Sequence, residues 1–242
     1  RSTLSSSSAA SDVYKRQAIE VLSSGERLAF LDLFSGEGFL TVGVRAHGLK
    51  AADGWKSNAE IAGKRWDLSN PADQAEAAQL IDYLDPVIVH AAVPQDGGKT
   101  KRSRGRRDRD KHKGYAEFVV GIIRSRVNVG GGGSIESPTD AIIWKHPAIR
   151  TFFGTRDSPL PGRTFTTIQL GTTTELEPSI LLAATYHEVA GSDAVTRPSG
   201  MSLDPEAGPS VVKGLIWADA ISRAAVRLAR SGAHRWSARE LL

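Results

Sequence analysis

The sequence predicts an α/β fold in which a parallel sheet is covered by helices on both faces. From residue 28 onward, short apolar segments alternate with segments of helical periodicity, and this alternation is typical of a parallel sheet. A glycine turn directly after the first apolar segment is the layout of folds that bind a ligand between a strand and the following helix. With 242 residues, of which 40% are hydrophobic, the chain is large enough to bury one good core. We therefore expect one α/β domain with at most a modest additional lobe.

The strands of this sheet are expected at four short apolar segments. In chain order they are Leu28–Phe34, Leu49–Asp53, Asp85–Ala91 and Ser134–Glu136. After Pro147 the pattern is weaker: residues 164–170 fit a strand, whereas residues 179–185 fit either a strand or a helix. Most of the sheet is therefore predicted before Pro147.

Helices are expected where apolar residues recur at a spacing of three and four. Residues 78–84 carry one such face, and residues 115–123 carry a second, strongly amphipathic one. Residues 217–228 show the same pattern near the end of the chain. These helices alternate with the predicted strands, as a sheet covered on both faces requires.

The glycine turn comprises residues 34–38, Phe-Ser-Gly-Glu-Gly. Gly36 and Gly38 can adopt a positive φ and let the backbone approach a ligand closely. The helix that follows offers unpaired N–H groups to an anion or a carboxylate. Asp53, at the end of the second strand, could hold two ribose hydroxyls, and Trp55 could lie flat on an adenine. The pattern indicates a nucleotide-like ligand.

The amino-acid sequence of this turn resembles the signature motif of a known family. Residues 32–39, Asp-Leu-Phe-Ser-Gly-Glu-Gly-Phe, are similar to the cofactor-binding motif of the cytosine-5 DNA methyltransferases, which use S-adenosylmethionine on a Rossmann-like sheet. Three further segments resemble motifs of that family in the same order. Arg65–Leu68 resembles the third-strand motif whose acid contacts adenine. Asp85–Pro94 resembles the fourth strand and the start of the catalytic loop, and Ser134–Pro138 resembles the strand with the Glu-Asn-Val motif. The resemblance covers roughly residues 28–147.

The resemblance implies a Rossmann-like methyltransferase sheet with helices on both faces and S-adenosylmethionine as the cofactor. The residues that would hold the cofactor are Phe34, Ser35, Gly36, Gly38, Asp53, Trp55 and Asp67. Phe34 could instead pack into the core. Residues 148–242 are few for both the family's last strands and its target-recognition lobe, so this lobe is expected to be reduced or absent.

The chain departs from the family pattern at its catalytic positions. Gln95 stands where the resemblance places the cysteine that attacks cytosine, and the chain contains no cysteine. An amide is not nucleophilic, so the family's cytosine chemistry is expected to be absent. Glu136 alone remains to recognise the cytosine edge, because Asn-Val is replaced by Ser137-Pro138. Gly54 also separates the ribose acid from the stacking aromatic, which are adjacent in the family.

Glu136 has a competing structural interpretation. The segment Glu136–Pro138 could simply end a strand, with Thr139 or Asp140 capping a helix that packs through residues 142–144. His90, at the end of an apolar strand, is interpreted as a structural histidine rather than a base. The six histidines show no spacing typical of a metal site, so no metal is expected.

A basic insertion is predicted between residues 97 and 114. It carries nine Lys or Arg against two Asp, and like charges without apolar anchors predict disorder in the free protein. It occupies the loop that, by the resemblance, closes over flipped-out DNA, so phosphate contacts are expected. The candidate residues are Lys99, Lys101, Arg102, Arg104, Arg106, Arg107 and Arg109. A solvated insertion or a nuclear-localisation signal would fit the same composition.

The beginning of the chain is kept apart from the fold. Residues 1–25 are Ser-rich without apolar periodicity and are interpreted as a disordered, non-native leader, with a transit peptide as the competing interpretation. No run of about 18 apolar residues occurs, so no membrane span is expected. The protein is accordingly expected in the nucleus or cytoplasm, or in an organelle if the leader is a transit peptide.

Two functional hypotheses follow, and the sequence leaves both open. The first is an S-adenosylmethionine-dependent transferase that acts on nucleic acid, DNA rather than RNA, which the intact glycine turn favours. The second is a catalytically inactive relative that binds nucleic acid, with or without cofactor, but has no turnover, which Gln95 favours. A third interpretation is that Gln95 and the basic insertion are translation artefacts of a shifted reading frame or a retained intron. The pattern does not determine the target sequence or the oligomeric state.

Overall fold

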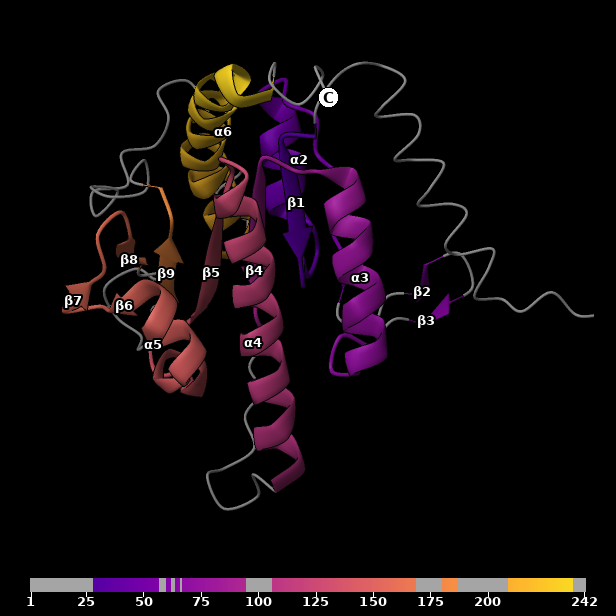
Figure 1. Ribbon diagram of the computed structural model, residues 1–242, viewed down its shortest axis with the longest axis vertical. Helices are drawn as coiled ribbons and strands as arrows, with labels where there is room; N and C mark the ends of the chain where they lie inside the picture. The colour runs from indigo at the N-terminus through magenta and orange to yellow at the C-terminus, as the bar shows by residue number, and fades with distance from the viewer. Residues whose placement is uncertain are drawn as a thin grey trace, which may run out of the picture.

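The protein has an α/β fold built on a mixed sheet of five strands with helices on both faces (Figure 1). The computed structural model describes residues 28–56, 60–61, 64–65, 67–94, 106–168, 180–186 and 209–236. Across the sheet the strands are β1 (Phe30–Leu33), β4 (Ile88–Ala92), β5 (Gly132–Pro138), β9 (Ile180–Ala184) and β8 (Thr164–Ile168). Each of the predicted strands 28–34, 85–91, 134–136 and 164–170 corresponds to one of them.

The direction of the strands corrects the prediction of a parallel sheet. β1, β4 and β5 are parallel, but β9 is antiparallel to both of its neighbours, β5 and β8. β9 follows β8 in the chain and pairs with it, and a parallel pair would need a crossover connection, usually a helix. Within the segment 179–185, which fitted either state, Ile180–Ala184 form the strand β9 by pairing with their neighbours.

The predicted second strand, Leu49–Asp53, does not form a continuous ladder. It lies beside β1 through two isolated parallel bridges, Phe30 with Ala51 and Leu33 with Trp55. The third strand expected around Asp67 is not part of the main sheet. Instead β2 (Glu60–Ile61) and β3 (Lys64–Arg65) form a separate antiparallel pair. A second short hairpin, β6 (Gly154–Thr155) with β7 (Ser158–Pro159), follows the helix α5 (Pro147–Phe153).

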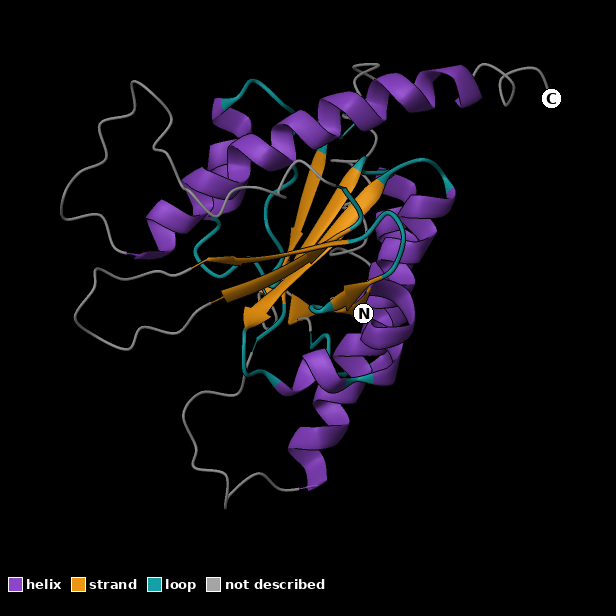
Figure 2. Cartoon of the chain, turned by 90° about the vertical axis from the view of Figure 1, so that its left-hand side faces the viewer, coloured by secondary structure: helices purple, strands orange, loops and turns teal. Residues whose placement is uncertain are grey.

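The helices cover the two faces of the sheet in separate groups. α2 (Phe39–Ala46) and α6 (Pro209–Trp236) pack together on one face. α3 (Pro71–Leu84), α4 (Arg106–Asn128) and α5 (Pro147–Phe153) cover the other face. Figure 2 shows the sheet between the long helix that leads to the C-terminus and the helices of the opposite face. The prediction of helices on both faces is confirmed.

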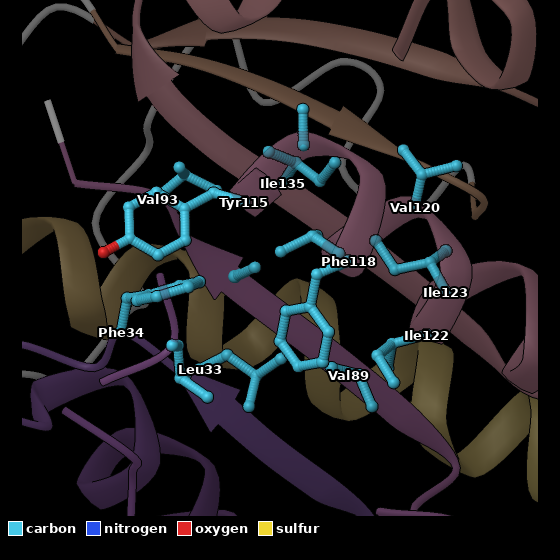
Figure 3. Close-up of a cluster of buried hydrophobic side chains, with 14 of the residues drawn as sticks. Leu33, Phe34, Val89, Val93, Tyr115, Phe118, Val120, Ile122, Ile123 and Ile135 are labelled. Carbon is cyan, nitrogen blue, oxygen red and sulfur yellow. The ribbon is translucent and has the colours of Figure 1, made fainter. Parts of the chain in front are cut away.

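The core on the α4 face has the side chains that the sequence pattern indicates. Tyr115, Phe118 and the other apolar residues of the predicted face over 115–123 are all buried against β1, β4 and β5 (Figure 3). On the strands the alternate residues point to this face, as the period of two requires. Leu31 and Leu33 of β1 belong to this cluster, whereas Phe30 belongs to the cluster under α2 and α6.

Two helix starts differ from the prediction. α4 begins at Arg106, inside the basic insertion, so residues 106–114 are helical and not disordered as predicted, because they continue the helix that packs on the sheet. The helix expected after Thr139 or Asp140 is a short 3-10 helix, η1 (Ile142–Lys145), whose N-cap is Ala141 without a side-chain hydrogen bond. None of the helices that the structure describes is long and apolar enough to cross a membrane.

Candidate functional site

A cavity of about 230 Å³ lies at the carboxyl ends of β1, β4 and β5. The segment that contains Ala51 and Trp55 lies on one side of β1, and β4 pairs with β1 on the other side. Strand order therefore reverses next to β1, and ligands of open α/β sheets bind outside the carboxyl ends of the strands at such a point. The cavity is thus located where this class of fold places its ligand.

The glycine loop after β1 forms one wall of the cavity. Phe34 has a φ of 60°, and Gly36 and Gly38 have φ values of 53° and 75°. A positive φ at a residue with a Cβ, as at Phe34, is uncommon and is often found at functional sites. Gly38 is the N-cap of α2, and no side chain caps this helix. The first N–H groups of α2 are therefore not occupied by a capping side chain.

The loop is held by the neighbouring segment. The N–H of Ser35 donates to the carbonyl of Trp55 at 3.1 Å, and the N–H of Trp55 donates to the carbonyl of Asp32 at 2.7 Å. A Cβ added at Gly54 would lie 2.3 Å from the Cβ of Ser35. Gly54, which separates Asp53 from Trp55, therefore leaves the space that Ser35 of the loop occupies.

A row of buried polar side chains crosses the sheet at the cavity, and two of its members, Asp32 and His90, line the cavity. Asp32 of β1, His90 of β4 and Ser134 of β5 are register partners on adjacent strands. All three are at most 2% exposed. Glu136 lies two residues beyond Ser134 on the same face of β5 and is also buried. Burying polar groups is unfavourable unless they find partners, so such a row in the centre of a sheet indicates a function.

The row is connected by hydrogen bonds through Ser134. The Tyr186 hydroxyl donates to Ser134 Oγ at 2.7 Å, and Ser134 Oγ lies 2.9 Å from His90 Nδ1. If the serine hydroxyl donates to Nδ1, the neutral imidazole carries its proton on Nε2. His90 Nε2 lies 3.6 Å from Glu136 Oε2, which is too long for a hydrogen bond. His90 is thus oriented by β5 and directed towards a carboxylate.

Trp217 of α6 closes the cavity from the helix side. Its ring packs edge-on against His90, with ring centroids 6.0 Å apart, and it is 1% exposed. Trp217 Nε1 and His90 Nε2 are both buried and form no hydrogen bond with the described residues. Trp217 thus contributes one N–H donor that the described residues leave without a partner, and His90 contributes a second when its neutral imidazole carries the proton on Nε2.

The described lining of the cavity contains acidic side chains and no lysine or arginine. Of the described residues that line it, three carry carboxyl groups, Asp32, Glu37 and Glu136, and none is Lys or Arg. The aromatic rings of Phe34, Phe39 and Trp217 also line it. Carboxylates and aromatic faces both attract cations. The arrangement suits a ligand that combines a positive charge with a hydrogen-bond acceptor.

The structure brings some of the predicted site residues together. Phe34, Ser35, Gly36 and Glu136 line the cavity, and Gly38 starts the adjoining helix. Phe34 also belongs to the core and packs edge-on against Tyr115 at 5.1 Å between ring centroids, so its interpretation as a core residue is confirmed (Figure 3).

Other predicted cofactor residues do not line the cavity. The Asp53 side chain is 74% exposed and forms an ion pair with Arg45 at 2.7 Å. Trp55 is only 3% exposed and belongs to the core on the α4 face. Asp67 is exposed, and its Oδ1 accepts hydrogen bonds from the N–H and the hydroxyl of Ser69. All three side chains have local partners.

Some candidates lie outside the part of the chain that the structure describes. They are Gln95, Lys99, Lys101, Arg102 and Arg104. Arg106, Arg107 and Arg109 lie in the first turns of α4, where only the backbone is described. The described residues contain no group of three His, Asp or Glu side chains that could hold a metal ion.

Four residues at the cavity are not among the predicted site residues. Asp32, His90 and Trp217 line it, and Ser134 lies next to it and contacts His90. The sequence carries a signal for Asp32 and His90, because each is a polar residue inside an apolar strand. They follow two residues after Phe30 and Ile88, so each shares the face of that apolar residue.

A scan against protein-family models and a search of curated proteins find no match to this chain. The family resemblance of residues 28–147 therefore remains a proposal.

Proposed function

We propose that this chain is an S-adenosylmethionine-dependent methyltransferase-like protein, related to the cytosine-5 DNA methyltransferases, that acts on or binds nucleic acid. The observation that carries the proposal is that the glycine loop and Glu136, which belong to separate motifs of the resemblance, line the same cavity. The location of this cavity at the reversal of strand order supports a nucleotide-like cofactor. DNA is favoured over RNA because the resemblance is to DNA enzymes.

The charges of the cavity fit one end of the cofactor. S-adenosylmethionine supplies a methyl group on a positively charged sulfur, next to an ammonium and a carboxylate. Asp32 and Glu136 are buried carboxyl groups that a cation would stabilise. The N–H groups of Trp217 and of the first turn of α2 would donate to the carboxylate.

The size of the cavity decides which part of the cofactor it would hold. Its volume of about 230 Å³ is below the roughly 300–1,000 Å³ of most ligand pockets. It therefore fits the methionine and sulfonium end, which carries the matching charges, and not the whole molecule. The adenosine would extend past the rim, where Asp53 lies at the same edge of the sheet.

A second candidate function is a relative that binds nucleic acid and cofactor without turnover. Gln95, with the lack of cysteine in the whole chain, favours it. Both candidates share the cofactor site and differ only in whether a methyl group is transferred. They are separated by the product that forms, not by binding.

Isothermal titration calorimetry with the full chain tests the cofactor site. We expect S-adenosylmethionine to bind in the micromolar range, about −8 kcal/mol. The demethylated product has an uncharged sulfur and is expected to bind roughly tenfold more weakly, since a desolvated cation–π contact contributes on the order of 1–2 kcal/mol. Glu136→Gln should reduce this difference. If the folded protein binds neither molecule, only the α/β fold remains and the cofactor proposal fails.

A methylation assay on cytosine-containing DNA tests the chemistry. We expect no transfer to carbon 5 and no covalent adduct with 5-fluorocytosine DNA, because this reaction requires a thiolate that adds to carbon 6. Gln95→Cys is expected to restore a detectable adduct, with wild type as the matched control. Robust carbon-5 methylation by the unmodified chain would overturn the assignment of Gln95 to the nucleophile position.

A further inference from the structure

A second hollow lies at the other end of α2 from the cofactor cavity. It is a groove of about 450 Å³ between the residues that follow α2 and the middle of α6. His47 and Leu49 form one side, and α6 forms the other from Asp219 to Arg230. Nothing in the proposed cofactor site uses it.

The α6 side of the groove carries a row of arginines. Arg223, Arg227 and Arg230 are spaced by four and three residues, so they lie on one face of the helix. At a rise of 1.5 Å per residue the row is about 10 Å long. Asp219, which pairs with Arg223, is the only carboxylate among the described lining residues. The groove is therefore net positive.

A buried hydroxyl in the groove adds an independent indication of a ligand. Ser222 is 5% exposed and lines the groove. Its Oγ has no hydrogen-bond partner within the described part of the chain. Buried hydroxyl groups are normally hydrogen-bonded, so an oxygen-bearing ligand at this position would complete the site.

We propose that this groove binds the phosphates of a nucleic-acid strand. The inference rests on the nucleic-acid part of the proposed function and names where the strand is held. Arginine is suited to this role because its planar fork donates two hydrogen bonds to one phosphate. A row of about 10 Å corresponds to the axial rise of about three nucleotides in one strand of a duplex, at 3.4 Å per nucleotide. The described lining has no Phe, Tyr or Trp, so the contact is to the backbone and independent of sequence.

The position of the row relative to the cofactor cavity supports one continuous strand. Trp217, in the cavity wall, and the row belong to the same helix. From Trp217 the row extends over about 9–20 Å along the helix axis. About six nucleotides of one strand of a duplex rise over the longer of these distances. The groove would then hold the backbone of a nucleic acid whose other end approaches the cavity.

The test measures oligonucleotide binding by fluorescence anisotropy over a series of salt concentrations. The variant is Arg227→Gln/Arg230→Gln, which keeps the Asp219–Arg223 pair. The matched control is Arg150→Gln/Arg156→Gln, which removes two exposed arginines elsewhere. Both are made in the full chain, and again in a chain in which Arg102, Arg104, Arg106 and Arg107 are replaced by Ser. The second background separates the groove from the basic insertion.

The expected result is a loss of salt dependence that is specific to the groove variant. Each lost phosphate contact lowers the slope of log K against log salt by about 0.7 for single strands and 0.9 for duplexes, so the double variant should lose about 1.4–1.8. The control should keep the wild-type slope, and Arg227→Lys/Arg230→Lys should keep most of it. Circular dichroism establishes that the variants are folded.

Three outcomes separate the proposal from its alternatives. If wild type binds and the groove variant has the wild-type slope in both backgrounds, the row is a solvated helix face and the inference is wrong. If inorganic phosphate stabilises wild type but not the variant, while the oligonucleotide slope is unchanged, the site takes free phosphate and the nucleic-acid proposal is also overturned. If wild type binds no oligonucleotide at all, the nucleic-acid part of the proposed function fails first.

Discussion

Replacing both Asp82 and Asp85 by Asn is expected to lower the free energy of unfolding by about 3 kcal/mol. Arg126, at the end of α4, has a side chain that is only 4% exposed, and it donates to Asp85 Oδ1 at 2.7 Å and to Asp82 Oδ1 at 2.6 Å. The double substitution leaves a buried guanidinium without a counter-charge, a defect that typically costs about 3–5 kcal/mol. The lower end applies because the amide oxygens of Asn can still accept hydrogen bonds.

The reverse substitution, Arg126→Met, is the matched control. It removes the buried charge and leaves the carboxylates of Asp82 and Asp85, which are 58% and 32% exposed and return to water. We expect this variant to lose only about 1 kcal/mol, the value of an exposed ion pair. Urea unfolding of the three proteins measures both effects. Equal losses in the two variants would mean that packing of the arginine stem, and not its buried charge, decides the stability of this helix pair.

Gly36→Val is expected to lower the affinity for S-adenosylmethionine at least 100-fold, about 2.7 kcal/mol, in the calorimetric assay. Gly36 lines the cavity with a φ of 53°, and a Cβ there would meet no protein atom within 4 Å. A valine side chain would therefore enter the space that the ligand needs. It would also force a β-branched residue into a backbone conformation that such residues rarely adopt.

The second effect makes a control necessary. Gly48 has a φ of 75°, and a Cβ there also meets nothing within 4 Å, but this glycine does not line the cavity. Gly48→Val therefore introduces a comparable strain without filling the site. We expect it to bind the cofactor like wild type after correction for any loss of folded protein. Unchanged binding by Gly36→Val would show that the glycine loop is not the cradle of the cofactor.

Local periodicity was enough to predict most elements on the first part of the chain. The alternation in β1 and the three-four spacing over 115–123 are properties of neighbouring residues, and the structure buries the residues so identified. The 3-10 helix after β5 was predicted less well. Its cap is Ala141 rather than Thr139 or Asp140, because polar residues suit a turn as well as a helix cap.

The direction of β9 could not be predicted from its own residues. The segment Ile180–Ala184 is apolar throughout and fits more than one element. Its state and direction depend on pairing with β5 and β8. Contacts between residues distant in the sequence therefore decided the mixed character of the sheet.

The residues of the candidate site could likewise be predicted from the sequence only in part. The glycine loop and Glu136 could be named from the sequence, because a glycine turn after a strand has a local conformational requirement and Glu136 belongs to a motif. The sequence by itself thus determined the α/β class, the location of the loop and the absence of a thiol nucleophile. Only the tertiary structure decided that Asp32, His90 and Ser134 form one buried row. Strand register brings them together, whereas in the sequence they lie in three separate segments.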